Sequence, residues 1–264
     1  MNVQQVTKKT RTTTQTQVDT DWVISEQAIA LVYNGISHAV MMATPDDLHD
    51  FALGFSLNEG IIERETDLLD FEVKQQTNGI ELNITLNSRQ FSALKNKRRS
   101  LAGNSGCGLC GVESLDQTVK SRPCLPKSSL ISLSACQHAI EQFIDKQVLR
   151  QKVGGVHGAA FCSTETGEVL LIREDVGRHN SLDKLIGALV KNKQQLTPDK
   201  GFILVSSRAS YEMVDKTIAA GINHLVSMSA ATSKAIDWAE QHQLNLIAFA
   251  SSTRQVIYAD NTIS

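Results

Sequence analysis

Aromatic residues are scarce in this chain, and charge of either sign is not in excess. Phe, Trp and Tyr together make up 5% of the 264 residues, and the formal net charge is only −2. A nearly balanced charge provides no general attraction to nucleic acid or to an anionic membrane, so any anion would have to be bound locally. No apolar run approaches the ~20 residues that a membrane-spanning helix needs. We therefore expect no nucleic-acid or membrane partner.

Cysteine is also sparse, and its distribution excludes a framework of disulfides. The chain has five cysteines, an odd number, and its start shows no secretory leader pattern. Both features favour a protein of the reducing cytoplasm. Cys107 and Cys110 form the one close-spaced pair, whereas a structural zinc site needs four ligands and commonly takes them from two such pairs. We therefore expect no structural metal, although isolated His or Cys side chains could still complete a site in space.

The Cys107–Cys110 pair lies in the segment GNSGCGLCG, residues 103–111, in which four of nine residues are glycine. Glycine opens backbone conformations that other residues avoid, so we expect a mobile loop over residues 100–112. A basic cluster precedes it, formed by Lys95, Lys97, Arg98 and Arg99. Positive charge favours thiolate over thiol, which would make one cysteine a nucleophile near neutral pH. Simple dithiol redox chemistry stays an alternative, although thioredoxin-like pairs lie between a strand and a helix rather than in a glycine-rich loop.

The N-terminal half has the pattern of a small α+β lobe. Residues 1–20 are rich in Thr, Gln and Lys and predict a disordered tail. In residues 21–126, Asn-Gly pairs at 34–35 and 78–79 separate β-forming runs and predict two hairpins. A helix is expected between them, with Thr44 as its N-cap and Gly60 beyond its end.

After a break at Pro123 and Pro126, residues 127–264 alternate between helical and strand patterns. Such alternation is typical of an α/β fold, and it predicts a mostly parallel sheet with helices on both faces. Four of the expected strands end in loops of small polar residues: 175–181, 206–210, 229–233 and 250–254.

These four loops are candidates for binding an extended, phosphorylated ligand. Ligands of open α/β sheets bind beyond the carboxyl ends of the strands, where helix N-termini attract anions. Arginine adds forked donors that suit phosphate oxygens. The candidate residues are Arg178, Ser207, Arg208, Thr232 and Arg254. The alternative is that the polar residues only cap helices and the arginines are solvated. For His157 we favour a structural role, and for His179 the sequence leaves proton transfer and hydrogen bonding equally open.

Four motifs together resemble one known family. They are GCGLCG at 106–111, GGVHGAAF at 154–161, REDVGRHNSLDKLIG at 173–187 and SSRASYEMVDKTIAAGI at 206–222. From about residue 20 to its end the chain resembles the formate dehydrogenase accessory sulfurtransferases, the FdhD family. The resemblance implies a cytoplasmic, homodimeric sulfur carrier. It would accept persulfide sulfur from a cysteine desulfurase and pass it to the bis(molybdopterin guanine dinucleotide) molybdenum cofactor before that cofactor enters the formate dehydrogenase catalytic subunit.

The resemblance also implies a fold and particular residues. The lobe at 127–264 would be a three-layer αβα lobe similar to cytidine deaminases, beside the smaller lobe at 21–126. Cys107 would carry the persulfide, with Cys110 as its motif partner. The cofactor-contacting stretch would fall on Leu246, Ile247, Ala248, Phe249, Ala250 and Ser251. The family pattern further leads us to expect an Arg soon after Phe249, whereas this chain has its next Arg at Arg254.

Two alternative functions can be compared with this hypothesis. Zinc-dependent deamination needs a His-x-Glu pair and a Pro-Cys-x-x-Cys motif. The sequence His157-Gly158-Ala159 lacks the glutamate, and Cys124 is followed by no second cysteine at that spacing, so deaminase chemistry is not expected. A chaperone that holds the molybdenum cofactor without moving sulfur remains open.

Overall fold

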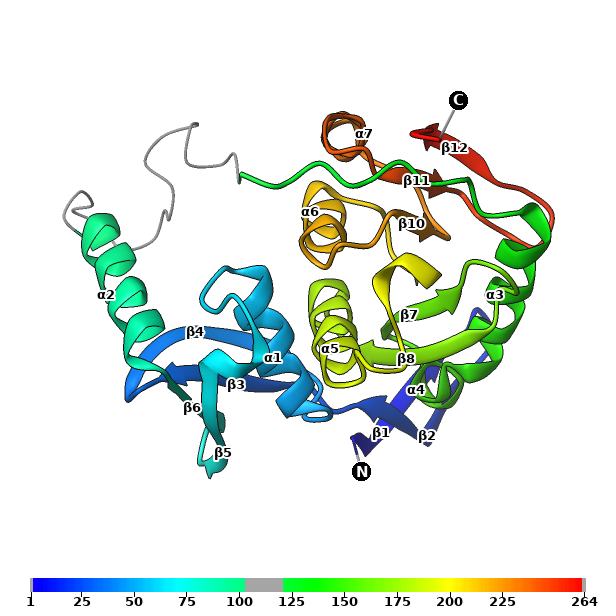
Figure 1. The fold of residues 1–264 in the computed structure, drawn as a ribbon. Coiled ribbons are helices and arrows are strands. Elements are labelled where there is room, and N and C mark those ends of the chain that lie inside the picture. The colour runs from blue at the N-terminus through cyan, green and yellow to red at the C-terminus, as the bar shows by residue number, and fades with distance from the viewer. Residues whose placement is uncertain (1, 103–120, 263–264) are drawn as a thin grey trace.

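The computed structural model describes residues 2–102 and 121–262, and the side chains of all of these except 97–102. Within these residues the chain forms three β-sheets and two lobes that lie side by side (Figure 1). No described helix is long and apolar enough to cross a membrane.

The chain starts with an antiparallel hairpin of β1 (Val3–Arg11) and β2 (Thr16–Ile24), where the sequence predicted a disordered tail. Nearly all of its side chains are exposed, so the composition correctly indicated that little would be buried. Backbone pairing nevertheless orders the segment, and helix α4 (Val148–Val153) lies against β2. There the Lys152 ammonium is 5.9 Å from the centre of the Trp22 ring.

The first lobe is a four-stranded sheet with one face covered by helix α1 (Leu48–Asn58). Its order is β4-β3-β6-β5, formed by β3 (Gln27–Tyr33), β4 (Ile36–Ala43), β5 (Leu68–Gln76) and β6 (Gly79–Leu86). Both predicted hairpins are confirmed, and the first turn uses Asn34 and Gly35 with φ of 46° and 79°. A short 3-10 helix (Glu65–Asp67) precedes β5, and α2 (Ser88–Ala102) ends the lobe.

Helix α1 begins three residues later than the sequence predicted, because its N-cap is Asp47 and not Thr44. Thr44 is fully buried, and both its backbone N–H and its hydroxyl donate to Asp175 of the second lobe. The Thr44 hydroxyl, which the local pattern assigned to helix capping, thus binds the distant Asp175 instead. Gly60 follows the helix with φ of 61°, as expected.

The second lobe contains a six-stranded sheet of mixed polarity, ordered β12-β11-β10-β9-β7-β8. Its strands are β7 (His157–Ser163), β8 (Val169–Asp175), β9 (Gly201–Val205), β10 (His224–Ser227), β11 (Asn245–Ala248) and β12 (Val256–Ala259). Strands β9, β10 and β11 are parallel, whereas β7, β8 and β12 join through antiparallel pairs. The prediction of a mostly parallel sheet is therefore wrong. The short turn at Gly167, with φ of 78°, returns the chain as a hairpin and leaves no room for a crossover helix.

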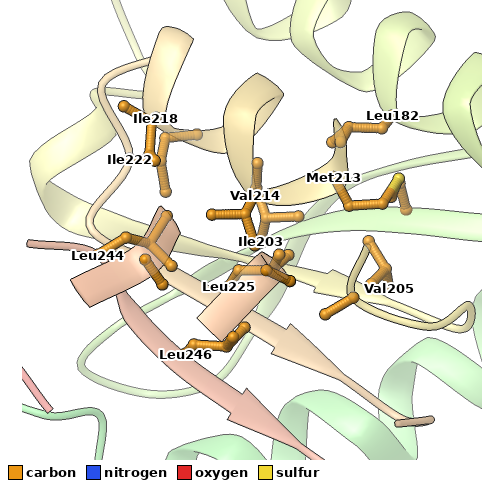
Figure 2. Packing of buried hydrophobic residues seen from close by; sticks show 14 of the residues in the cluster. Leu182, Ile203, Val205, Met213, Val214, Ile218, Ile222, Leu225, Leu244 and Leu246 are labelled. Atoms are coloured by element: carbon orange, nitrogen blue, oxygen red, sulfur yellow. The ribbon is translucent and has the colours of Figure 1, made fainter. Parts of the chain in front are cut away.

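Helices cover both faces of this sheet, so the lobe has three layers. Helix α3 (Leu133–Lys146) packs on one face, and α5 (Arg178–Lys191), α6 (Tyr211–Ala219) and α7 (Ser233–Gln241) pack on the other. Alternate residues of β9 point to opposite faces, so Ile203 lies in one buried cluster and Phe202 in the other. Figure 2 shows Val214 and Ile218 of α6 above Ile203, Leu225 and Leu246 of the strands.

The two lobes meet where α1 crosses α5, and two glycines allow the close approach. A Cβ atom on Gly54 would collide with the carbonyl oxygen of Asp183, and one on Gly187 with that of Asp50. Residues before the predicted boundary at 126 already pack with the second lobe, since Leu125 lies in its core. The division of the chain into two domains stays a prediction.

Candidate functional site

The polarity of the strands brings the four predicted polar loops to one edge of the six-stranded sheet. Strands β9, β10 and β11 are mutually parallel, and two successive antiparallel pairings make β8 parallel to β9 as well. Their carboxyl ends therefore lie at the same edge. We call this the carboxyl edge; it consists of residues 175–181, 206–210, 229–233 and 249–254.

Backbone hydrogen bonds join three of these loops into one surface. Ala209 donates to the carbonyl of Ala230 at 3.0 Å, and Thr232 donates back to Ala209 at 3.0 Å. Phe249 donates to the carbonyl of Ser229 at 2.8 Å. Below them the buried Ser227 hydroxyl donates to the Ser207 carbonyl at 2.6 Å. The loops are therefore held together before any ligand arrives.

Three helices begin at the carboxyl edge without side-chain caps. The N-caps of α5, α6 and α7 are Gly177, Ser210 and Thr232, and none of them accepts a capping hydrogen bond from the described residues. Helix α3, on the other face of the sheet, is by contrast capped by Ser132, whose hydroxyl accepts from Ala135 at 3.1 Å. The Ser210 hydroxyl is buried and has no partner within the part of the chain that is described. Uncapped N–H groups and the positive ends of three helices make this edge suitable for an anion.

Basic side chains add to this potential. Arg208 is exposed, and Arg178 has a buried Nε atom without a hydrogen-bond partner in the described residues. The His157 pKa is lowered from its ordinary value, chiefly by burial and then by the nearby charges of Arg178, Arg150 and His179. His179 links the start of α5 to the start of α6, because its Nε2 atom is 2.8 Å from a carboxylate oxygen of Glu212.

Phe249 occupies an unusual position at this edge. Its φ of 48° is uncommon for a bulky residue, and the side chain is 42% exposed. The Arg254 guanidinium lies 5.8 Å from the centre of the Phe249 ring. The arginine expected soon after Phe249 is absent, and Arg254, five residues further along the chain, lies beside this ring instead.

The sequence from residue 24 to residue 263 matches the model of the FdhD/NarQ family. The chain belongs to this family. A curated FdhD protein of Variovorax paradoxus (strain S110), named sulfur carrier protein FdhD, is 48% identical over 238 residues, 90% of this chain and 84% of that protein. A protein of the same name from Cupriavidus necator is 47% identical over 239 residues, 90% and 82% of the two chains.

One solved structure has a similar fold over the whole chain. A crystal structure described as a putative formate dehydrogenase accessory protein from Desulfotalea psychrophila covers all of both chains with a TM-score of 0.75. At 17% sequence identity this likeness shows the fold alone.

The predicted cofactor-contacting stretch is divided by the structure. Leu246, Ile247 and Ala248 are buried in β11, and Ala250 is buried just after it. Their side chains belong to the core, so these four residues can contribute only backbone groups to the carboxyl edge. Phe249 and Ser251 are the members of the stretch whose side chains reach the surface.

Cys107 and Cys110 lie outside the described residues, and their predicted role stays a prediction. The other cysteines can be compared with that role. Burial raises the pKa of Cys136 to about 12 and raises that of Cys162 further still, so neither thiol ionises near neutral pH. Cys124 is exposed, with its Sγ atom 3.6 Å from the carbonyl of Gln241.

A cavity of about 490 Å³ lies far from the carboxyl edge, at the opposite ends of α5 and α6. Leu57, Ile186, Leu189 and Ile222 provide part of its mostly apolar lining, and Arg122 stands among them. Arg122 is already bound to both carboxylate oxygens of Asp215 at 2.9 Å. The described residues contain no group of three side chains that could hold a metal ion.

Proposed function

We propose that this chain is a cytoplasmic sulfurtransferase that accepts persulfide sulfur from a cysteine desulfurase and transfers it to the bis(molybdopterin guanine dinucleotide) molybdenum cofactor. The cofactor is the substrate, and the formate dehydrogenase catalytic subunit is the recipient. The carboxyl edge carries the proposal, because three uncapped helix N-termini and several arginines gather there in a chain closely related to proteins named sulfur carriers.

The carboxyl edge suits the guanine dinucleotide arms of this substrate. Phosphate oxygens would be bound by the helix N-termini and by Arg178, Arg208 and Arg254, with hydroxyls of Ser207 and Thr232 beside them. The exposed ring of Phe249, next to Arg254, offers a face on which a guanine base stacks.

The sulfur step requires a thiolate, which we assign to Cys107. Its sulfur attacks the terminal sulfur of the donor persulfide, the donor S–S bond breaks, and the desulfurase cysteine leaves as a thiolate. Cys107 then carries the persulfide to the cofactor. Cys110 either resolves a disulfide, accepts the sulfur in turn, or tunes the reactivity of Cys107.

We propose that the three-layer second lobe has the cytidine deaminase-like fold that the family resemblance implies, without deaminase chemistry. Zinc-dependent deamination needs a His-x-Glu pair, whereas His157 is followed here by Gly158 and Ala159. We further propose that two copies of the chain form a homodimer.

The proposal is tested by mass spectrometry of the intact protein and of its peptides after incubation with a cysteine desulfurase and cysteine. One added sulfur, about 32 Da, is expected on the peptide that contains Cys107 and Cys110. Cys107→Ala should abolish the gain, and the matched variant Cys124→Ala should keep it. Labelling mainly of Cys124, Cys136 or Cys162 would contradict the assignment.

The chaperone alternative is separated from sulfur transfer by complementation. We expect Cys107→Ala to bind GDP, which stands for the guanine nucleotide arm, as well as the parent does. The same variant should fail to support formate dehydrogenase. Full support by Cys107→Ala would favour a chaperone that moves no sulfur.

A further inference from the structure

Asp175 is the last residue of β8 and the first residue of the carboxyl edge, and its carboxylate is fully buried. One oxygen, Oδ1, accepts from the backbone N–H of Gly177 at 2.8 Å and from the side-chain amide of Asn180 at 3.0 Å. The other, Oδ2, accepts from the Thr44 N–H at 3.0 Å, the Thr44 hydroxyl at 2.7 Å and the Lys184 ammonium at 2.7 Å. Five donors therefore converge on one carboxylate that cannot reach a ligand.

The two residues bound by Oδ1 flank the residues that face the edge. Gly177 and Asn180 stand on either side of Arg178 and His179 at the start of α5. Gly177 is also the N-cap of that helix, so Asp175 binds the turn at the position where a capping side chain is missing. Its carboxylate thus fixes the backbone from which Arg178 projects.

The same group ties this turn to the first lobe. Lys184 donates to the Thr44 carbonyl at 3.0 Å and to its hydroxyl at 2.7 Å. Asn180 donates to the carbonyl of Met42 at 2.8 Å. The end of β4 and the start of α5 are therefore held by one buried network, which restricts movement of the Arg178 turn.

A second buried carboxylate, that of Asp183 on α5, provides a matched comparison. Asp183 is also buried, and both of its oxygens accept from the Lys216 ammonium, at 2.6 and 2.7 Å. Its further partner is the side-chain amide of Asn58. These partners lie in helices α1 and α6, so Asp183 stabilises helix contacts without binding the edge loop.

We infer that Asp175 is a positioning residue for ligand binding at the carboxyl edge, acting by fixing the Gly177–Asn180 turn so that Arg178 meets a phosphate group. The inference rests on the proposed function, because it takes the guanine nucleotide arm as the ligand. Preorganised donors bind more tightly, since less ordering is required when the ligand arrives.

The experiment measures the affinity of the full chain for a fluorescent GDP, at a temperature where circular dichroism shows each variant folded. Asp175→Asn places an amide N–H among five donors and should weaken GDP binding tenfold or more. Asp183→Asn should lower the Tm comparably but leave GDP affinity within twofold. The effect of Asp175→Asn should vanish in an Arg178→Ala background, because both changes remove the same interaction.

A second variant tests the turn without altering a buried charge. An added Cβ at Gly177, whose φ of −96° accepts alanine, would press against the Asn180 amide. Gly177→Ala should therefore also weaken GDP binding, which keeps the test decisive if Asp175→Asn does not fold. Unchanged affinity in either folded variant, or an equal loss in Asp183→Asn, overturns the positioning role alone. A parent protein that binds no GDP overturns the proposed substrate and this role with it.

Discussion

The two ends of helix α5 show how differently one helix can be used. At its start, Gly177 and Arg178 leave polar donors facing the carboxyl edge. In its second half, Gly187 lies against α1, and Ile186 and Leu189 line the apolar cavity of about 490 Å³. The cavity and the proposed anion-binding surface thus lie at opposite ends of the helix. The cavity is mostly apolar, whereas the three helix N-termini without side-chain caps lie at the carboxyl edge.

The largest effect expected from this comparison is on stability, at the second half of α5. Gly187→Ala should lower the free energy of unfolding by about 3 kcal/mol, because the new methyl group collides with backbone of α1. GDP affinity of the folded protein should not change. Denaturant unfolding measures the first quantity. The control Gly60→Ala, which has open space and a φ of 61°, should lose only about 1 kcal/mol; equal losses would show that α1 and α5 can separate easily.

At the carboxyl edge the expected effect is on binding. Arg208→Ala should lose about 1.5 to 3 kcal/mol of GDP binding if it donates a charged hydrogen bond to phosphate, with no change in Tm. Binding by the parent should weaken as salt is added. Lys193→Ala, at the cavity end, is the control and should bind GDP normally. Identical titration curves for Arg208→Ala and the parent would move the phosphate site elsewhere.

A smaller effect on stability is expected from backbone strain at Phe249, on the carboxyl edge. Because a φ of 48° disfavours any side chain, Phe249→Gly should be about 1 kcal/mol more stable than Phe249→Ala. Chemical denaturation of the two variants measures the difference. Equal stabilities would mean that the edge stores no strain at this position.

The smallest effect is on histidine protonation. The pKa of His157 is lowered below 6.5 by burial and by Arg178, and the pKa of His49 is lowered by burial and by Lys191 at the other end of α5. Since both folded pKa values are depressed, the unfolded chain binds more protons, and stability should fall as the pH drops below about 6.5. In an NMR titration, GDP should raise the His157 pKa and leave that of His49 unchanged. A shift at both residues would indicate a change throughout the protein rather than an anion at the edge.

Local sequence patterns predicted many of the elements. The Asn-Gly pairs predicted two hairpins. At 34–35 both residues of the pair have the positive φ that few other residues accept, whereas at 78–79 only Gly79, the first residue of β6, has one. Leu182, Leu185, Ile186 and Leu189 have the spacing of one helix face, and these residues form the buried side of α5. The N-terminal hairpin of β1 and β2 was not predicted, because its strands bury almost no side chains and therefore show no apolar pattern.

The sequence indicated the side chains that gather at the carboxyl edge but not the residues that support them, and the role of these side chains in binding stays a prediction. Arg178, Arg208 and Arg254 were recognisable because they follow expected strands, and parallel strands bring their carboxyl ends together. Asp175 was not singled out. An aspartate at a strand end resembles an ordinary turn residue, and its partner Thr44 is 131 residues away in the sequence.

The sequence by itself determined the periodic elements, the polar loops and the family, because these depend on neighbouring residues and on motifs. The tertiary structure alone decided which buried charges meet. Asp175 and Asp183 stand on or next to the same helix and look alike in the sequence, yet one binds the turn at the carboxyl edge and the other binds helices. That difference arises from long-range contacts with Thr44 and Lys216, which no local pattern records.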